Sequence, residues 1–373
     1  MKKRLNIGMI GHKFMGKAHS YALREIPLIF DLEVDPVMKV ICGVEDDIAQ
    51  AAEKYGWESY ETSWEKVVDN PEIDIIDIAS PGVTHKEIAV AAARKGKHIL
   101  CEKPLAMTFD EAKEMYESAE ENKVKHMVNF NYRRIPAVNL ARKLVEEGKL
   151  GKIYNFNATY QQDWPLDEKF PFVWRFDKSI AGAGSLADKG SHVIDLARML
   201  IGEFEEISCT TDIFVKERTL PGAGGSRKEV TTDDAAVFIA RFKNGALGLF
   251  ETSRMCAGHR NSLAFEINGS KGSVKFTMER FNELDVFFTE DIGEVQGFRN
   301  ILVTHPDHEY MKYWWPTGHI LGWGQTFTHQ YYEFLKAINE DYMPTPSFYD
   351  GMKNQEIIEA AQRAALEKRW IKI

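Results

Sequence analysis

The stretch LNIGMIGHKFMGKAHS, residues 5–20, sets the architecture of the N-terminal part of the chain. Its first six residues are an apolar run typical of a buried strand, and Gly11 and Gly16 enclose a turn that leads into helix-forming residues. Such a turn points backbone amides and the positive end of the helix dipole at an anion. We therefore predict that Gly11, Lys13, Phe14 and Met15 contribute to a dinucleotide-binding site.

Lys13 stands where a G-x-G-x-x-G turn has its second glycine, so the motif is incomplete. Its side chain must turn aside, and its ammonium would then add positive charge near a phosphate. The alternative is a plain strand–turn–helix unit with a solvated lysine. After the second strand, where an acidic residue would bind the ribose of NAD, Gly43 takes the usual place and Glu45 follows it. Lys13 and Gly43 favour NADP and Glu45 favours NAD, so we expect NAD or NADP.

Apolar strands alternate with helix-forming segments over about the first 130 residues. Thr108 and Glu111 have the spacing of a capping box at the start of one helix. The alternation predicts an α/β fold with a parallel, doubly wound sheet. The strands are expected at residues 5–10, 38–44, 73–80, 97–103 and 125–132, and the helices at 16–26, 47–56, 85–96 and from 108 onward.

The sequence pattern changes after about residue 150. Two β-type runs within residues 236–255 are joined by Asn244-Gly245, a strong signal for a hairpin turn, and residues 263–278 repeat this arrangement. We therefore expect a second domain with an antiparallel or mixed sheet and with helices on one of its faces. Its helices are expected near residues 185–201, 326–340 and 351–368.

Composition excludes several classes of protein. The 373 residues carry a net charge of −9 and no basic run, so a nucleic-acid partner is not expected. No apolar run reaches the roughly 18 residues of a membrane span, and the apolar stretch after the basic N-terminus is too short for a signal peptide. The four cysteines, Cys42, Cys101, Cys209 and Cys256, are far apart in the sequence. Buried free thiols in a reducing cytosol are their simplest interpretation, so a cytoplasmic protein is expected.

Candidate catalytic residues follow two of the expected strands and occupy one later helix. ASPGVTH (79–85) follows one strand and CEKPL (101–105) ends the next. The carboxyl edge of a doubly wound sheet is where ligands bind, so Lys103 should point into that crevice. GAGSLADKGSHVIDLARMLIG (182–202) is expected to form a small-residue turn and then a helix on which Asp188 and His192, four residues apart, share one face.

A lysine, an aspartate and a histidine in one cleft would form an acid–base set. His192 could accept a proton from an alcohol near neutral pH, with Asp188 orienting it, and Lys103 could polarise the developing carbonyl. The alternatives are an ordinary pair on a helix surface, or two metal ligands that lack an obvious third. We therefore predict no metal site. His305 and His308 have a spacing that metal ligands use, but they stand in a polar segment and are expected in a loop.

Five motifs, in this order and spacing, resemble the glucose–fructose oxidoreductase / inositol dehydrogenase / rhizopine-catabolism (GFO/IDH/MocA) family over essentially the whole chain. They are GHKFMGKAHS, SPGVTH, CEKPLA, HMVNFNYRR and GSLADKGSHVIDLARML. The stretches YQQDWP and FVWRFDKSIAGAGSLAD are most similar to the branch that contains levoglucosan dehydrogenase.

The resemblance implies a Rossmann domain that binds NAD(P) at residues 1–128. It also implies an α+β domain at 129–373, with a large open, mainly antiparallel sheet, for substrate binding and for homodimer or homotetramer contacts. The implied activity is hydride transfer between nicotinamide and a secondary alcohol of a sugar, an anhydrosugar or a cyclitol. A non-catalytic NAD(P)-sensing regulator or a keto-sugar reductase is the alternative.

The resemblance also assigns individual residues. Lys103, Asp188 and His192 match the catalytic residues of the family, and Pro81, His85 and Glu102 match positions on the nicotinamide side. The sugar-facing wall is matched by Tyr132, Arg133, Gln162, Asp163, Trp164 and Trp174. Aromatic faces and carboxylates suit the CH and OH surfaces of a sugar.

Overall fold

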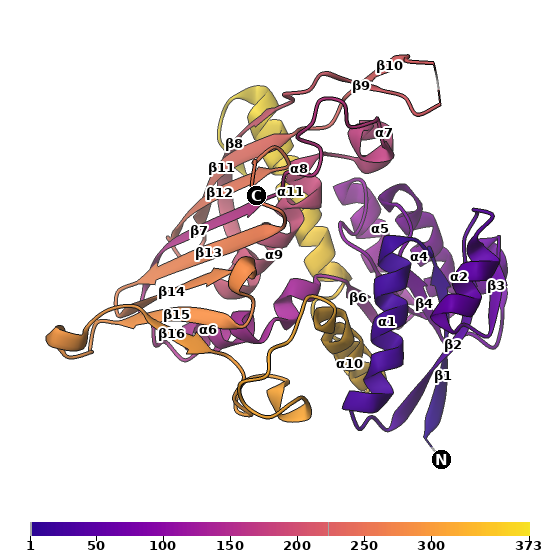
Figure 1. Cartoon of the computed structure of the whole chain (residues 1–373), viewed down its shortest axis with the longest axis horizontal. Helices are drawn as coiled ribbons and strands as arrows, with labels where there is room; N and C mark the ends of the chain where they lie inside the picture. The colour runs from indigo at the N-terminus through magenta and orange to yellow at the C-terminus, as the bar shows by residue number, and fades with distance from the viewer. Residues whose placement is uncertain (1, 223) are drawn as a thin grey trace. The chain divides into compact units, whose positions relative to one another are not determined.

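The structure is a computed structural model that describes residues 2–222 and 224–373 (Figure 1). The chain forms two compact units. The first comprises the residues up to Arg134 together with Gly322–Gln355, and the second comprises Ile135–Leu321 and Glu356–Ile373. The sequence predicted a boundary after residue 128 and assigned 322–355 to the second domain. That segment instead lies in the first unit, because its helix packs on the first helix of the chain.

The described part of the first unit contains a six-stranded parallel sheet in the order β3-β2-β1-β4-β5-β6, which confirms the predicted doubly wound fold. The order reverses between β1 and β4, so the crevice for a ligand lies beyond the carboxyl ends of these strands. Ile75, Ile76 and Ile78 are completely buried, as expected for a strand covered on both faces. The strands are β1 (Lys3–Ile10), β2 (Val34–Cys42), β3 (Ser59–Glu61), β4 (Ile75–Ile78), β5 (His98–Cys101) and β6 (His126–Val128).

Helices cover both faces of this sheet (Figure 1). Thr108 caps α5, since its hydroxyl accepts the Glu111 N–H at 3.2 Å, as the capping-box spacing predicts. The Glu111 carboxylate bonds to the Met107 N–H rather than to that of Thr108. The late helix α10 packs on the α1 side, where Tyr332 stacks on Phe30 with ring centroids 4.1 Å apart. The helices of this unit are α1 (Phe14–Ile29), α2 (Ile48–Tyr55), α3 (Trp64–Asp69), α4 (His85–Arg94), α5 (Phe109–Glu121), α10 (Gln325–Glu340) and the start of α11 (Phe348–Glu367).

The second unit is built on a large mixed sheet, whose nine strands within the described residues run in the order β16-β15-β14-β13-β7-β12-β11-β8-β17. Its pairs are antiparallel except for β7 with β12, in agreement with the predicted, mainly antiparallel sheet. Asn244-Gly245 forms the predicted hairpin turn, with Gly245 at φ 86°. The strands are β7 (Ile153–Gln161), β8 (Phe204–Asp212), β11 (Ala235–Phe242), β12 (Leu247–Ser253), β13 (Ser262–Gly269), β14 (Gly272–Thr277), β15 (Glu283–Phe288), β16 (Arg299–Leu302) and β17 (Ile371–Lys372), and β9 (Glu217–Thr219) pairs separately with β10 (Arg227–Glu229).

Helices α6 (Pro136–Glu146), α8 (Ser185–Asp188) and α9 (Gly190–Leu200) pack on one face of the large sheet. Alternate residues of each strand point to this face, so Phe156 is buried on β7 while Asn157 points to the other side. The second face of the sheet is exposed. It carries an apolar group on β11 and β12 whose members keep between 43% and 50% of their surface accessible: Val237, Ile239, Leu247 and Leu249.

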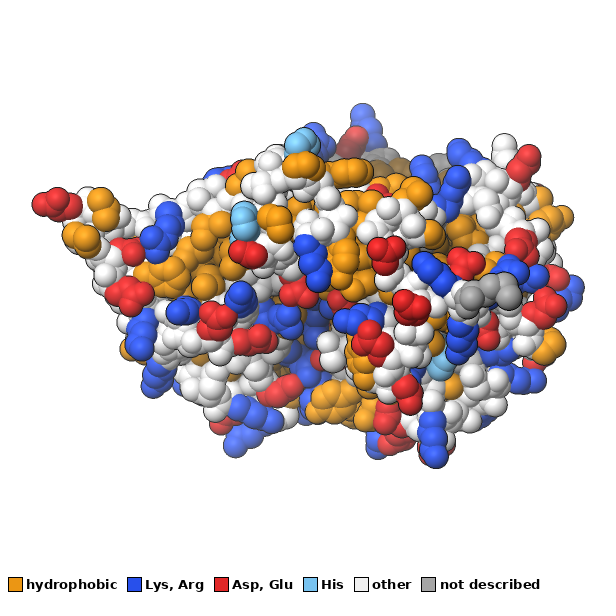
Figure 2. Space-filling view, turned by 90° about the horizontal axis from the view of Figure 1, so that it is seen from below, with side chains coloured by type: hydrophobic (Ala, Val, Ile, Leu, Met, Phe, Trp, Pro, Cys, Tyr) orange, Lys and Arg blue, Asp and Glu red, His pale blue; other side chains and the backbone are white. Residues whose placement is uncertain are grey.

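The surface seen in Figure 2 carries interspersed acidic and basic side chains, in keeping with the modest negative net charge. Over residues 2–222 and 224–373, no helix has both the length and the apolar character needed to span a membrane.

Candidate active site

The glycine turn after β1 has the geometry of a phosphate cradle. Gly11 adopts φ 109°, and a Cβ there would lie 2.5 Å from the Ala79 carbonyl oxygen, so only glycine lets the turn approach the loop after β4. A Cβ on Gly16 would lie 2.1 Å from the Gly11 oxygen, which lets α1 start directly against the turn. Lys13 has φ −72°, an ordinary value for a residue with a side chain. The open cradle and the N-terminus of α1 fit a pyrophosphate.

The side chains of His12 and Lys13 bind acidic residues that follow β2. Asp47 Oδ1 accepts hydrogen bonds from Lys13 Nζ at 2.6 Å and His12 Nε2 at 2.8 Å, and these two bonds lower the pKa of Asp47 to about 2. Glu45 Oε2 lies 3.5 Å from the other nitrogen of His12. The buried His12 ring also explains Gly43, because a Cβ there would lie 2.1 Å from the ring.

These contacts change the interpretation of the cofactor signals in the sequence. The charge of Lys13 is paired with Asp47, and Gly43 makes room for a ring, so neither residue is a signal for NADP. Sequence reasoning identified Glu45 but missed His12 and Asp47. The acidic run at 45–47 directly after the strand was the available signal for Asp47.

His85 ties together the two loops at the carboxyl edge of the first sheet. Its ring is buried, with Nε2 2.9 Å from the Ser80 carbonyl oxygen and Nδ1 3.2 Å from the carbonyl oxygens of Pro104 and Leu105. Both ring nitrogens are therefore engaged with the backbone. The contacts hold the loop of Pro81 beside the loop that carries Lys103.

Glu102 lies directly before Lys103 at the end of β5, and its carboxylate is buried. Oε1 contacts His19 Nε2 at 3.0 Å and Asn129 Nδ2 at 2.5 Å, and Oε2 accepts the Lys103 N–H at 3.2 Å. The predicted Tyr132 is also buried in this unit, with its hydroxyl 3.4 Å from Trp323 Nε1.

In the second unit, Asp188 and His192 do not lie on one continuous helix, so the prediction of a single helix near residues 185–201 is wrong. Helix α8 ends at Asp188 and α9 begins at Gly190. The carbonyl of the intervening Lys189 accepts the N–H groups of His192 and Val193, and so starts the second helix. A buried charge lies at this junction, since Lys189 Nζ is 3.2 Å from Asp188 Oδ2 and the residue is 1% exposed.

His192 is buried on α9, with the Tyr160 ring edge-on at a centroid distance of 5.9 Å. Sequence reasoning missed Lys189 because a lysine on a helix is expected in solvent. His305 and His308 lie in the predicted loop. Within the described ranges no cluster of three or more His, Cys, Asp and Glu side chains is arranged to hold a metal ion.

The predicted sugar-facing residues after β7 divide into two kinds. Gln162 and Asp163 bind the loop at 258–261: Gln162 Nε2 donates to Asn261 at 2.7 Å, and Asp163 Oδ2 accepts the Gly258 N–H at 3.1 Å. Trp174 is instead 38% exposed. Trp164 is half-buried and offers an aromatic face. The two tryptophans are therefore the better candidates for direct contact with a substrate.

Two arginines hold the loop that carries Trp164. The Trp164 ring stacks on Phe176 with centroids 5.6 Å apart, and the guanidinium groups of Arg218 and Arg254 lie over Phe176 at 4.7 and 4.6 Å. Arg218 is completely buried and donates to three loop carbonyls, those of Pro165, Asp167 and Phe170. Arg254 is anchored by Asp234 at 2.7 Å. No local motif marks these residues, which lie far from Trp164 in the sequence.

Comparison with protein-family models places this geometry in a known family. The model described as an oxidoreductase family with an NAD-binding Rossmann fold matches residues 5–130, and the model of the GFO/IDH/MocA C-terminal domain matches residues 138–275. The chain belongs to the GFO/IDH/MocA family. The resemblance seen in the sequence is therefore confirmed, as are the Rossmann fold, the nicotinamide cofactor NAD and the oxidoreductase class.

Two characterised members of the GFO/IDH/MocA family are similar over nearly their whole length. Levoglucosan dehydrogenase of Pseudarthrobacter phenanthrenivorans is 42% identical, over 100% of this chain and 98% of the relative. Glucose-6-phosphate 3-dehydrogenase of Bacillus subtilis is 30% identical, over 96% of this chain and 95% of the relative. A solved structure of levoglucosan dehydrogenase in complex with NADH and levoglucosan is 42% identical, has a TM-score of 0.96 and covers 100% of both chains.

Proposed function

We propose that this chain is an NAD-dependent dehydrogenase that acts on a secondary alcohol of a sugar, an anhydrosugar or a cyclitol. The observation that carries the proposal is the presence, in one chain, of a glycine cradle that fits a pyrophosphate, of an Asp188–Lys189 ion pair where the helix of His192 begins, and of a loop that carries the aromatic ring of Trp164. Levoglucosan is the first substrate to test, because the levoglucosan dehydrogenase is similar over the full length of the chain.

In the proposed mechanism, bound NAD supplies the hydride acceptor. His192 takes the proton of the substrate hydroxyl, because imidazole titrates near neutral pH. Asp188 orients the imidazole, and the neighbouring Lys189 balances the charge of Asp188. The Lys103 ammonium donates a hydrogen bond to the reacting oxygen and so stabilises the charge that develops there. Trp164 and Trp174 would hold the apolar face of the sugar ring.

The proposal is tested by following reduction of NAD and, separately, NADP with levoglucosan, glucose, glucose 6-phosphate and myo-inositol. With the best substrate, His192→Ala and Lys103→Met should each lower kcat by about 10²- to 10⁴-fold, the usual contribution of acid–base groups. Rates within threefold of the unchanged protein would refute these assignments. Binding of NADH without turnover of any of these alcohols would instead support the regulatory alternative.

We propose that NAD is preferred over NADP. Asp47 and Glu45 offer carboxylates where the adenosine ribose of a Rossmann cofactor binds, and a 2′-phosphate would meet their negative charge. Lys13 does not offset this repulsion fully, because its ammonium is already paired with Asp47.

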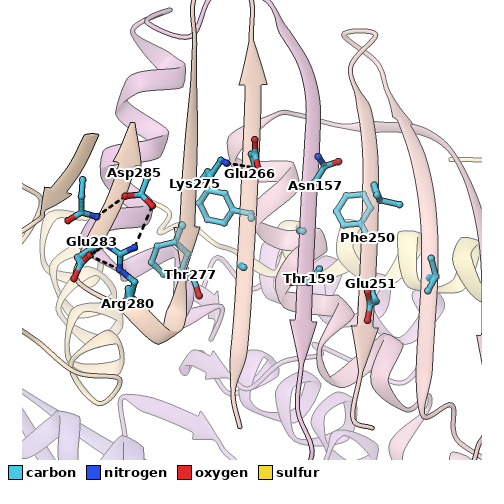
Figure 3. A pocket seen from close by; sticks show the side chains of 17 residues that line it. Asn157, Thr159, Phe250, Glu251, Glu266, Lys275, Thr277, Arg280, Glu283 and Asp285 are labelled. Carbon is cyan, nitrogen blue, oxygen red and sulfur yellow. Dashed lines mark hydrogen bonds and ion pairs between the residues drawn. The ribbon is translucent and has the colours of Figure 1, made fainter. Parts of the chain in front are cut away.

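We also propose that the protein is a cytoplasmic homo-oligomer, in which a second copy covers the exposed face of the large sheet. Register places Leu249, Asn157, Glu266, Lys275 and Asp285 side by side across five strands of this face. These residues line a hollow of about 430 Å³. Figure 3 shows its side chains, with the hydrogen bonds and ion pairs between them drawn as dashed lines.

The apolar group and the paired charges of this face form a surface that the same face of a second chain can complement. The four cysteines, all within the described residues, are free thiols, which suits a reducing compartment.

A further inference from the structure

A buried cluster of charged side chains lies below the carboxyl edge of the first sheet, within the first unit. His19 of α1 is at its centre and is completely buried. Its Nδ1 lies 3.0 Å from both carboxylate oxygens of Asp77, and its Nε2 lies 3.0 Å from Glu102 Oε1. Asn129 donates to Glu102, and the Tyr331 hydroxyl donates to Asp77. All five residues have an exposure of 5% or less.

This geometry favours one charge state of the histidine. A neutral imidazole has one N–H, and its Nε2 could accept from the Asn129 amide, whose nitrogen lies 2.8 Å away. Carboxylates lie 3.0 Å from both ring nitrogens, however, and this favours an imidazolium that donates to Asp77 and to Glu102. Two ionised carboxylates could not be buried here without such a cation. The interactions with Asp77 and Glu102 outweigh the burial of the ring, and they raise the pKa of His19 to about 10. The same contacts lower the pKa of Glu102.

Glu102 connects this cation to the predicted catalytic lysine. One carboxylate oxygen of Glu102 is held by His19 and Asn129, and the other accepts the backbone N–H of Lys103. The remaining titratable neighbours are Asp77 from β4, Tyr331 from α10, His85 from α4, and Cys101 and Lys103 next to Glu102 in the chain. Among the five side chains of the cluster, that of His19 is the one that can be cationic, and the Lys103 ammonium also favours the ionised form of Glu102.

We propose that His19 is a positively charged positioning residue that acts through Glu102 on Lys103. It keeps the Glu102 carboxylate ionised and oriented, so the loop that presents Lys103 stays in one conformation. The inference rests on the proposed function for the role of Lys103. The inference adds to the proposed function a positioning residue on α1, in the stretch after the phosphate cradle.

The test is the pH profile of kcat for His19→Gln, which keeps an amide for hydrogen bonding but removes the charge. A matched control is His126→Gln, because His126 is also buried in this unit and contacts a glutamate, Glu120, at 2.9 Å without touching Glu102. His19→Gln should lower kcat about 10- to 100-fold at pH 7.5, the range expected for a displaced catalytic group.

His19→Gln should also add an ionisation near neutral pH, because one of two uncompensated buried carboxylates then takes up a proton. His126→Gln should change kcat by less than threefold and should leave its pH profile unchanged. An unchanged profile for His19→Gln, in a variant with a normal circular dichroism spectrum and normal NADH binding, would overturn the proposal.

A second measurement uses the unaltered protein and covers the case in which His19→Gln does not fold. NMR of histidine-labelled protein should show one imidazole, assigned to His19, that stays protonated from pH 6 to pH 9. A neutral His19 at pH 8 would overturn the proposal. This result does not depend on turnover, so it is distinguishable from a failure of the proposed dehydrogenase activity, which would appear as no reduction of NAD by the unaltered protein.

Discussion

The Lys13 ammonium lies 2.6 Å from Asp47 Oδ1, so the residue that replaces a glycine in the phosphate turn is bound to a carboxylate beyond β2. A lysine in this turn would otherwise be a natural partner for a phosphate. Because Asp47 also accepts from His12, one carboxylate holds two basic side chains just beyond β2. We expect the local balance of charge here, rather than the glycine pattern, to set the choice of cofactor.

Substitutions on the two sides of this pair should change cofactor preference in opposite directions. Asp47→Asn removes a negative charge and leaves Lys13 available to a 2′-phosphate, so the ratio of kcat/KM for NADP to that for NAD should rise about three- to fivefold, the modest effect of an exposed pair. Lys13→Gly removes the ammonium that is paired with Asp47 and should weaken NADP more than NAD. Equal changes for both cofactors would show that the pair has no part in the choice.

Much of the fold was predictable because its signals are local. The apolar strands, the βα alternation and the Asn244-Gly245 turn depend on residues close together in the sequence. The assignment of residues 322–355 to the first unit was not predictable. Helix α10 packs on α1 from about 300 residues away, and no local pattern encodes that contact. The interruption at Lys189 was also missed, because the flanking residues have ordinary helical spacing.

The candidate site was predictable to the extent that motifs carry it. Lys103 and His192 stand in recognisable stretches, whereas Arg218 and His19 act through contacts with residues that lie far away in the sequence. Burial of an arginine or a histidinium contradicts the usual exposure of charged residues, so composition gives no warning of it. Only the assembled contacts show that Arg218 binds the carbonyls of the Trp164 loop and that His19 binds Asp77 and Glu102.

Replacing Arg218 should weaken sugar binding without a comparable effect on the chemical step. Arg218→Lys keeps the charge but loses the planar fork that binds three loop carbonyls, so the Trp164 loop should become less ordered. We expect KM for the sugar to rise about tenfold, with kcat within threefold and the Kd of NADH unchanged. Arg227→Lys, at an exposed position on β10, is the control. A KM equal to that of the control would contradict this role.

The raised pKa of His19 should make the folded protein lose stability at alkaline pH. A histidine in an unfolded chain has a pKa near 6.5, and in the folded chain the pKa is about 10, so the folded state binds the extra proton between these values. The stabilisation that protonated His19 gives to the folded state is complete below pH 6.5 and is lost as the pH rises through 10.

Urea denaturation of the unaltered protein should therefore show the free energy of unfolding falling by about 1.4 kcal/mol per pH unit between pH 8 and pH 10 from this group. The slope should be smaller in His19→Gln, where the group is absent. Equal slopes in the two proteins would mean that His19 does not carry the proton.

A charge placed on the exposed face of the large sheet should dissociate the proposed oligomer. Leu249 is half-exposed on β12, between Ile239 of β11 and Asn157 of β7 in the register of the sheet. In Leu249→Glu, assembly would bury an unpaired carboxylate, which is costly, so sedimentation equilibrium should give the mass of a single chain. Leu366→Glu on α11, at a position that is 83% exposed, is the control and should keep the assembly of the unaltered protein. If the unaltered protein sediments as a single chain of 42.6 kDa, or if Leu249→Glu assembles normally, this face is not where the copies meet.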